Sequence, residues 1–464
     1  MVDQGSFGLL FWAFLAVYGA ALYAMAPAAR TPEGFFRGRD RMGRETSRWM
    51  LTSSVFIAWI FAKSVTNAAN LGAEYGVVGG IAYAAYWLSI PVAGFAIHAI
   101  RRTTGATGMV PFLVSKYGRG AAVAFGIAIL IRLYNEVWSN TEVVGGYYGA
   151  PGSAAFIGSA LVFTVAVLLY SVKGGLRSSI FTDVLHAAVF VAFLGVVLFF
   201  ILPRHAPREL LGAGRFSLAT GGDLVLVALL QVLSYPFHDP VLTDRGFITE
   251  ERTMLKAFIV AGAAGFVAIF LFSLVGVHAR LEGIAVHGNA PAAVARSFGL
   301  GALFLMTVIM VNAAGSTLDS AFSSISKAVA LDVPQLAGRV PGRGSVPLGT
   351  AAMVVVALLG NIPMLFGADI LAATTISGTM VIGLAPAFLL QRLVRHSPAS
   401  FHLAFWPGVA LGALFTAKLI PQAWAIGTGK YSILLGTNAY GLAICTAGFL
   451  LPLAWSRPSR ALAA

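Results

Sequence analysis

The stretch from Val311 to Asp332, VNAAGSTLDSAFSSISKAVALD, gathers hydroxyl side chains and a carboxylate at the end of an apolar run. On a helix, one face would hold Ser316, Ser320, Ser323 and Ser324, with Thr317 and Asp319 at its edges. Hydroxyls, carbonyls and a carboxylate are the oxygen ligands that hard cations such as Na+ take. Small hydroxyl residues also serve as contacts between membrane helices. The residues alone therefore leave a cation site and a helix-packing surface both open.

Further ionisable residues fall inside apolar runs. They are Lys63, Arg132, Glu136, Asp183, His186, His238, Asp239 and Asp319. A charged group in hydrocarbon costs several kcal/mol, so such residues usually face a cavity or a partner. Each of them is either part of a functional site or one half of a pair that fixes helix packing.

The composition excludes a soluble globular protein. Hydrophobic residues make up 58% of the 464 residues, charged residues 11%, and the mean hydropathy is +0.83. The net charge of +13 is explained by topology, because 22 of the 31 Lys and Arg fall in alternate loops on one side. We expect a multi-pass protein of a bacterial-type plasma membrane, with the N-terminus outside and the C-terminus in the cytoplasm. Its basic loops would contact anionic lipid, not nucleic acid.

A span needs about 20 mostly apolar residues, and this length predicts thirteen transmembrane helices. They are expected near 6–26, 47–72, 77–100, 118–147, 151–170, 178–202, 221–240, 254–278, 299–328, 347–367, 369–391, 403–426 and 432–455. The spans occupy most of the chain, so we expect no soluble domain. The first span lacks a basic flank and a cleavage motif, which favours a retained helix over a signal peptide.

Two motifs resemble the sodium:solute symporter family. The segment AGSTLDSAFSSISKAVALD is similar to a family helix of the pattern A-x-x-S-T-x-D-S, and YSVKGGLRSSIFTDVLH is similar to an inner loop followed by T-D-V-x-Q, with His186 in place of the glutamine. The stretch EYGVVGGIAYAAYW loosely resembles the urea and polyamine branch. The resemblance implies an all-α integral membrane protein with a LeuT-like core of two inverted five-helix repeats. These would cover 47–202 and 221–391 within a single transporter domain, with the helix at 6–26 before them and two helices at 403–455 after them.

The resemblance also implies sites. A sodium ion would be bound by Ile57, Ile60, Ala313, Ser316 and Thr317, and a second cation by Asp183, Asp319 and Ser320. The substrate pocket would be formed by Lys63, Ser64, Asn67, Tyr83, Trp87, Glu136, Tyr235, Phe237 and His238. The substrate and the ions would bind where the first helix of each repeat is interrupted.

The interruption is visible in the second repeat, where Pro236 and Pro240 each remove a backbone donor. The first repeat has few glycines at the matching position, and Asn67 and Asn70 are expected to satisfy a local unwinding there. Lys63 lies too deep for its ammonium to reach an interface easily. Three readings of Lys63 stay open: a salt bridge to Glu136, a substrate contact, or a built-in cation in place of sodium.

The sequence therefore predicts a secondary active transporter that carries a small polar organic solute, such as an amino acid, a urea-like or amine compound, or a carboxylate, into the cell with Na+. One alternative is a Na+-independent or H+-coupled transporter, and another is a transport-like membrane sensor. An enzyme is not expected, because no nucleophile with its base, metal-ligand cluster or phosphate loop is recognisable. We expect a monomer that needs no cofactor besides the coupling ion.

Overall fold

The computed structural model describes residues 4–340, 342, 344–366 and 377–455, and the elements in them are helical. Within these residues, ten helices are long and apolar enough to cross a membrane, or eleven if the bent pair α3 and α4 counts as one span. The ten are α1 (Gln4–Met25), α5 (Val77–Ala84) continued by α6 (Ser89–Thr104), α7 (Met109–Tyr148), α8 (Ala154–Gly174), α9 (Leu176–Ile201), α13 (Glu251–Leu281), α15 (Leu300–Lys327), α17 (Ser345–Leu359), α20 (Pro398–Thr416) and α21 (Ser432–Trp455). The chain is a multi-pass membrane protein.

The count of thirteen is not confirmed. The expected span at 221–240 is interrupted after α11 (Asp223–Gln231), which leaves a helix too short to cross a membrane by itself. The expected span at 369–391 lies partly outside the described residues, as does the last position of the span at 347–367. The described part of the expected span at 369–391 contains the short helix α19 (Leu384–Leu389).

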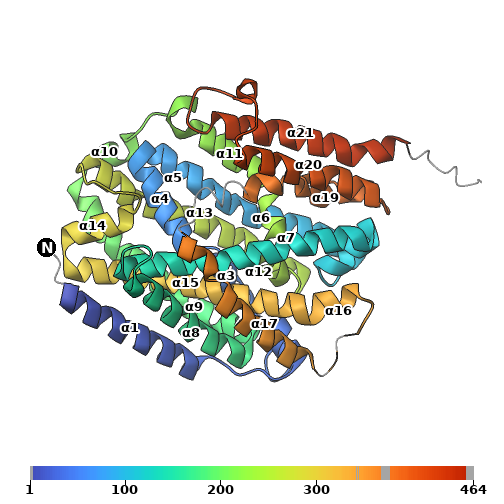
Figure 1. Ribbon diagram of the computed structural model, residues 1–464, viewed down its shortest axis with the longest axis horizontal. Coiled ribbons are helices and arrows are strands. Elements are labelled where there is room, and N and C mark those ends of the chain that lie inside the picture. The colour runs from blue at the N-terminus through green and yellow to red at the C-terminus, as the bar shows by residue number, and fades with distance from the viewer. Residues whose placement is uncertain (1–3, 341, 343, 367–376, 456–464) are drawn as a thin grey trace, which may run out of the picture.

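Shorter helices complete the described part of the chain. They are α2 (Pro32–Arg37), α10 (Pro207–Gly212), α12 (Pro240–Arg245), α14 (Ala290–Phe298) and α16 (Val333–Leu336). Figure 1 places α1 beside α8 on one flank and the pair α20 and α21 on the opposite flank. It also places α10 and α14 at the end of the molecule where the chain begins, and α16 at the other end.

The first interrupted helix consists of α3 (Arg48–Ala58) and α4 (Ala62–Tyr75), which meet at an angle of 59°. Their junction contains no glycine. The first free amide of α4, that of Ala62, donates to the side-chain oxygen of Asn140 on α7 at 3.2 Å. This bond satisfies a donor that a helix start leaves unpaired.

The expectation that Asn67 and Asn70 stabilise this interruption is wrong. Asn67 donates to the hydroxyl of Tyr83, whereas Asn70 donates to the carbonyl of Gly288 and accepts from the amide of Ala290, the first residue of α14. Both asparagines lie within α4, beyond the interruption, so their side chains serve contacts between elements.

The second interruption follows α11, as the two prolines predict. Residues Tyr235–His238 form a short 3-10 turn, and Pro240 begins α12. The carboxylate of Asp239 accepts from the amide of Val241 at 3.0 Å and caps α12. Proline is tolerated at the first helical position because its missing donor would be unpaired there.

Candidate functional site

The hydroxyl-bearing face of α15 packs against the interruption between α3 and α4. The hydroxyl of Thr317 lies 3.4 Å from the carbonyl of Ala58, the last residue of α3, and 3.1 Å from the carbonyl of Ala313. Ile57 and Ile60, on either side of Ala58, are fully buried. The structure thus places Thr317 between the carbonyl of Ala313 and the end of α3, where Ile57 precedes Ala58 and Ile60 lies within the interruption.

The fifth expected sodium ligand, Ser316, is directed elsewhere. Its hydroxyl donates to the carboxylate of Asp183 on α9 at 2.5 Å, and Ser54 on α3 donates to the same carboxylate at 2.5 Å. Ser316 therefore links the Thr317 region to the expected second cation site.

The residues expected for that second site gather where α9 meets α15. The carboxylate of Asp319 accepts from Ser179 at 2.7 Å and from Thr182 at 2.8 Å. The hydroxyl of Ser320 lies 3.1 Å from that of Ser179. All four side chains are fully buried, so this group of oxygens is shielded from water.

Arg245 completes this group, and the sequence analysis missed it. Its guanidinium donates to Asp183 at 3.1 Å, to Ser320 at 2.7 Å and to Ser54 at 2.7 Å. The 22 Lys and Arg assigned to loops in the sequence analysis include Arg245, and for this residue the assignment was wrong, because it lies in α12 and its side chain is 0% exposed. The signal that could have revealed it is the apolar sequence PVL that begins at Pro240, which continues the interrupted helix into α12.

We call Asp183, Asp319, Arg245 and the hydroxyls bonded to them the Asp319 cluster. Within the described residues, Arg245 forms a salt bridge with Asp183 and no salt bridge reaches Asp319. With both carboxylates ionised, the two anions and one cation sum to one negative charge. His186 borders the cluster, since ligand atoms of Asp183, His186 and Asp319 lie within 4.8 Å of one another.

A small cavity lies at the interruption between α3 and α4. Its lining residues are Trp59, Phe61, Lys63, Ser64, Tyr83, Tyr86, Trp87 and Tyr235. The cavity measures about 20 Å³, which is room for about one water molecule. Five of these residues were expected from the sequence, whereas Trp59, Phe61 and Tyr86 were not. We call this cavity the chamber.

Polar groups of the chamber are concentrated on α4 and α5. The hydroxyl of Tyr83 donates to Ser64 at 3.2 Å and accepts from Asn67 at 3.3 Å. Trp87 forms another wall of the chamber. The indole ring of Trp87 packs against Gly265 of α13, where a larger side chain would clash with it. The indole nitrogen of Trp87 has no hydrogen-bond partner among the described residues.

Four buried charges adjoin the chamber, and we call them the Lys63 cluster. Lys63 pairs with Glu136 at 2.9 Å, Arg132 pairs with the same Glu136, and Arg132 also pairs with Asp239 at 3.1 Å. The four side chains are at most 2% exposed. Two cations and two anions balance, so the salt bridge read from the sequence exists as part of a larger neutral network.

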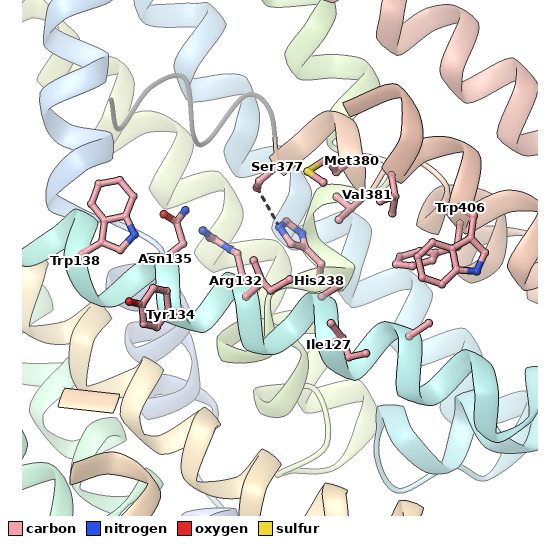
Figure 2. A pocket seen from close by; sticks show the side chains of 15 residues that line it. Ile127, Arg132, Tyr134, Asn135, Trp138, His238, Ser377, Met380, Val381 and Trp406 are labelled. Atoms are coloured by element: carbon pink, nitrogen blue, oxygen red, sulfur yellow. Dashed lines mark hydrogen bonds between the residues drawn. The ribbon is translucent and has the colours of Figure 1, made fainter. Parts of the chain in front are cut away.

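Phe237 and His238 do not line the chamber. The ring of Phe237 stacks on Phe388, with centroids 4.5 Å apart. His238 faces a separate pocket of about 400 Å³ between α7 and α20, where it lies 3.4 Å from the hydroxyl of Ser377 (Figure 2). Arg132 lines this pocket as well, and therefore separates it from the chamber.

Comparison with curated proteins finds solute transporters. The chain is 23% identical over 263 residues to the urea active transporter of Saccharomyces cerevisiae, a match that covers 50% of this chain and 35% of the relative. It is 25% identical over 202 residues to the urea-proton symporter DUR3 of Oryza sativa subsp. japonica, a match that covers 42% of this chain and 27% of that relative. It is 24% identical over 196 residues to human sodium/glucose cotransporter 4, a match that covers 40% of this chain and 27% of that relative. These matches span about a third of the relatives' length, and no family model matches the chain.

Solved structures show the same fold. A Na+-coupled sialic acid symporter in a substrate-bound outward-open state superimposes with a TM-score of 0.75 at 14% identity, covering 98% of this chain and 100% of that chain. Mhp1, a nucleobase-cation-symport-1 family transporter in a closed conformation, gives a TM-score of 0.56 at 14% identity, covering 93% and 96%. Both are transporters of the LeuT-like fold that the resemblance implied, and neither they nor the curated relatives are enzymes. The resemblance of this chain to the sodium:solute symporter family, near its urea-transporter branch, is confirmed.

Proposed function

We propose that the protein is a secondary active transporter that moves a small, uncharged polar solute into the cell together with Na+. One observation carries the proposal: the same three-residue interruption borders both candidate sites. The carbonyl of Ala58 faces Thr317 at 3.4 Å, while the neighbouring Trp59 and Phe61 line the chamber. An ion that fixes the interruption would thereby set the shape of the chamber, which is the physical basis of coupling.

The coupling ion is proposed to bind between the interruption and α15. Carbonyls of Ile57, Ile60 and Ala313 with the hydroxyl of Thr317 offer neutral oxygens, which suit Na+. Ser316 can rotate from Asp183 to join them. The one negative charge left in the Asp319 cluster favours a cation nearby, because opposite charges attract strongly where water is scarce.

The solute is proposed to be small, because the chamber has about 20 Å³ of free space. Aromatic rings form most of its wall, and the chamber must widen to admit any solute, by least for a compact planar molecule that lies against those rings. A solute of urea or amide size matches this better than a hexose.

The solute is also proposed to be uncharged. The charges of the Lys63 cluster already balance, so an ionic solute would bring an unpaired charge into a buried site. Hydrogen-bonding capacity remains, because Lys63 uses two of its three donors, on Glu136 and Ser139. A carbonyl acceptor could take the third.

The proposal is tested by uptake into proteoliposomes that contain the purified protein. Radiolabelled urea, acetamide, acetate and glucose are supplied with an inward gradient of Na+ or of choline. We expect accumulation of a neutral amide that needs the Na+ gradient and is not competed by acetate. Accumulation of glucose in preference to the amides would overturn the proposed solute class.

A matched pair of variants tests the ion site. Thr317→Ala removes the hydroxyl beside Ala58, whereas Thr307→Ala removes a buried hydroxyl on the same helix that bonds the carbonyl of Leu303. Only the former should weaken the response to Na+. An equal effect of both would point to a general loss of helix packing.

Proton coupling is the second candidate, and the Asp319 cluster favours it. A buried carboxylate without a salt bridge can take up a proton in place of a metal cation, and His186 stands beside it with its Nδ1 unbonded among the described residues. Uptake that follows an inward pH gradient without Na+ would select this candidate.

A further inference from the structure

A second set of metal-ligand side chains lies at the opposite end of α13 from the basic loops, away from the chamber. His205 follows the turn Leu202–Arg204 at the end of α9, and His278 and Glu282 lie four residues apart at the end of α13. That spacing puts both α13 groups on one face of the last turn. Figure 1 shows the neighbouring helices α10 and α14 at the end where the chain begins.

The three side chains converge. The Nε2 of His205 lies 2.8 Å from the Nδ1 of His278 and 3.6 Å from a carboxylate oxygen of Glu282. Ligand atoms of the three residues all fall within 4.8 Å of one another. Bonds of about 2.0–2.2 Å in a tetrahedral zinc site separate neighbouring ligand atoms by roughly 3.3 Å. The observed distances lie on both sides of that value, so small rotations would suffice.

Burial fits a site with one open position. The side chain of His205 is 8% exposed and that of Glu282 is 43% exposed, while His278 is 1% exposed. The two imidazoles thus form the floor, and the carboxylate forms the rim where water enters. Two His, one Glu and a water molecule are a common ligand set for Zn2+.

The nearby cations are held by other groups. The guanidinium of Arg204 stacks over the ring of Phe298 at 4.4 Å, and Arg280 donates to the carbonyls of Ala73 and Glu74. The carboxylate of Glu282 offsets their positive field at the ligand atoms.

We propose that His205, His278 and Glu282 bind a zinc-type transition-metal ion, and that the bound ion restrains the transporter. The ion would tie the end of α9 to the end of α13, next to Phe298 of α14, whose ring lies 5.7 Å from that of His278. The loop before α14 is bonded to Asn70 of α4, and α14 leads into α15. Metal binding would therefore hold the elements that border both transport sites and slow uptake. The effect on uptake rests on the proposed function, whereas the binding itself does not.

Binding is measured on the full-length protein after removal of any polyhistidine tag. The protein is freed of metal with a chelator and titrated with Zn2+, with Co2+ as a spectroscopic probe, and with Mg2+ for comparison. We expect one Co2+ per chain with the absorption of a tetrahedral site, competed by Zn2+ and not by Mg2+. A thermal shift with Zn2+ should accompany it.

The variants are His205→Ala and Glu282→Gln, which change groups outside the helix core. The control is His287→Ala, an exposed histidine in the following loop. Outer-shell changes alone weaken metal sites about 10–100-fold, so loss of either ligand should weaken Zn2+ binding by more than about tenfold, and the control should not. Zn2+ binding that is unchanged in both variants, or absent from the unmodified protein, would overturn the proposal. Binding without any effect on uptake would retain the metal site and refute the restraint.

Discussion

The Lys63 cluster and the Asp319 cluster are both buried in the membrane domain, yet they differ in charge balance. The first has two cations and two anions, joined in a chain from Lys63 to Asp239. The second has two carboxylates and one guanidinium, and among the described residues the carboxylate of Asp319 accepts from hydroxyls but has no salt bridge. A balanced network needs no further ion, whereas the unbalanced cluster favours a bound cation or a proton.

This difference suggests separate roles for the two clusters. The Lys63 cluster holds α4, α7 and the second interruption together beside the chamber, and so keeps the solute site neutral. The Asp319 cluster lies behind Thr317 and shares Ser316 with it. It would act on the coupling ion through its charge.

The largest effect is expected from unbalancing the Lys63 cluster. Glu136→Gln leaves Lys63 and Arg132 facing a single carboxylate, and such a loss typically destabilises a protein by about 3–5 kcal/mol. Lys63→Met with Glu136→Gln restores the balance through Arg132 and Asp239. Thermal unfolding in detergent should show a large loss for the single variant and recovery in the double variant. A double variant less stable than either single variant would contradict the description of the network.

Removing the unbalanced charge is expected to change coupling more than stability. Asp319→Asn keeps one of the two oxygens that accept from Ser179 and Thr182, replaces the other with an amide donor, and makes the cluster neutral. The concentration of Na+ needed for half-maximal uptake should rise about tenfold or more, a change of about 1.4 kcal/mol in binding free energy. The control is Asp223→Asn, a buried aspartate at the start of α11 whose carboxylate accepts from the amides of Leu224 and Tyr431. If Asp319→Asn and the unmodified protein show the same Na+ dependence, Asp319 serves helix packing and not ion coupling.

Asp183→Asn sharpens the contrast, because it removes the carboxylate that Arg245 needs. It should lower stability as well as alter the Na+ response, in contrast to Asp319→Asn. Thermal unfolding of the two variants in the same detergent should show a lower unfolding temperature for Asp183→Asn than for Asp319→Asn. Equal stability of the two would mean that Arg245 can pair with either carboxylate.

The smallest effect concerns the interruption that lies between the clusters. Asn140→Ala removes the acceptor for the amide of Ala62, and loss of such a cap typically costs about 1 kcal/mol. Asn140→Asp keeps the acceptor but places a buried negative charge beside Glu136, to which the Asn140 amide donates at 3.1 Å, so it should be less stable than Asn140→Ala. An unfolding temperature that does not change in Asn140→Ala would show that the cap is not needed to hold the interruption.

Much of the fold could be read from local pattern. Apolar runs predicted the long helices of the described residues, although the run at 221–240 is interrupted after α11, and helical periodicity placed Thr317 and Asp319 near one polar face. Pro236 and Pro240 predicted the second interruption, because proline lacks the donor that a continuous helix requires. The first interruption has no such residue, and its cap comes from Asn140 on another helix.

The sequence by itself determined the membrane class, the hydroxyl face of α15 and the presence of buried charges, since these depend on residues close together in the chain. Only the tertiary structure decided which charges pair. Lys63 and Glu136 are 73 residues apart, and Arg245 and Asp183 are 62 apart, so no local pattern connects them. Helix packing also turned Arg245 from an expected loop cation into a buried one and moved His238 out of the chamber. Pairing in a low-dielectric interior is set by distance in space, and that distance is fixed by how the helices pack.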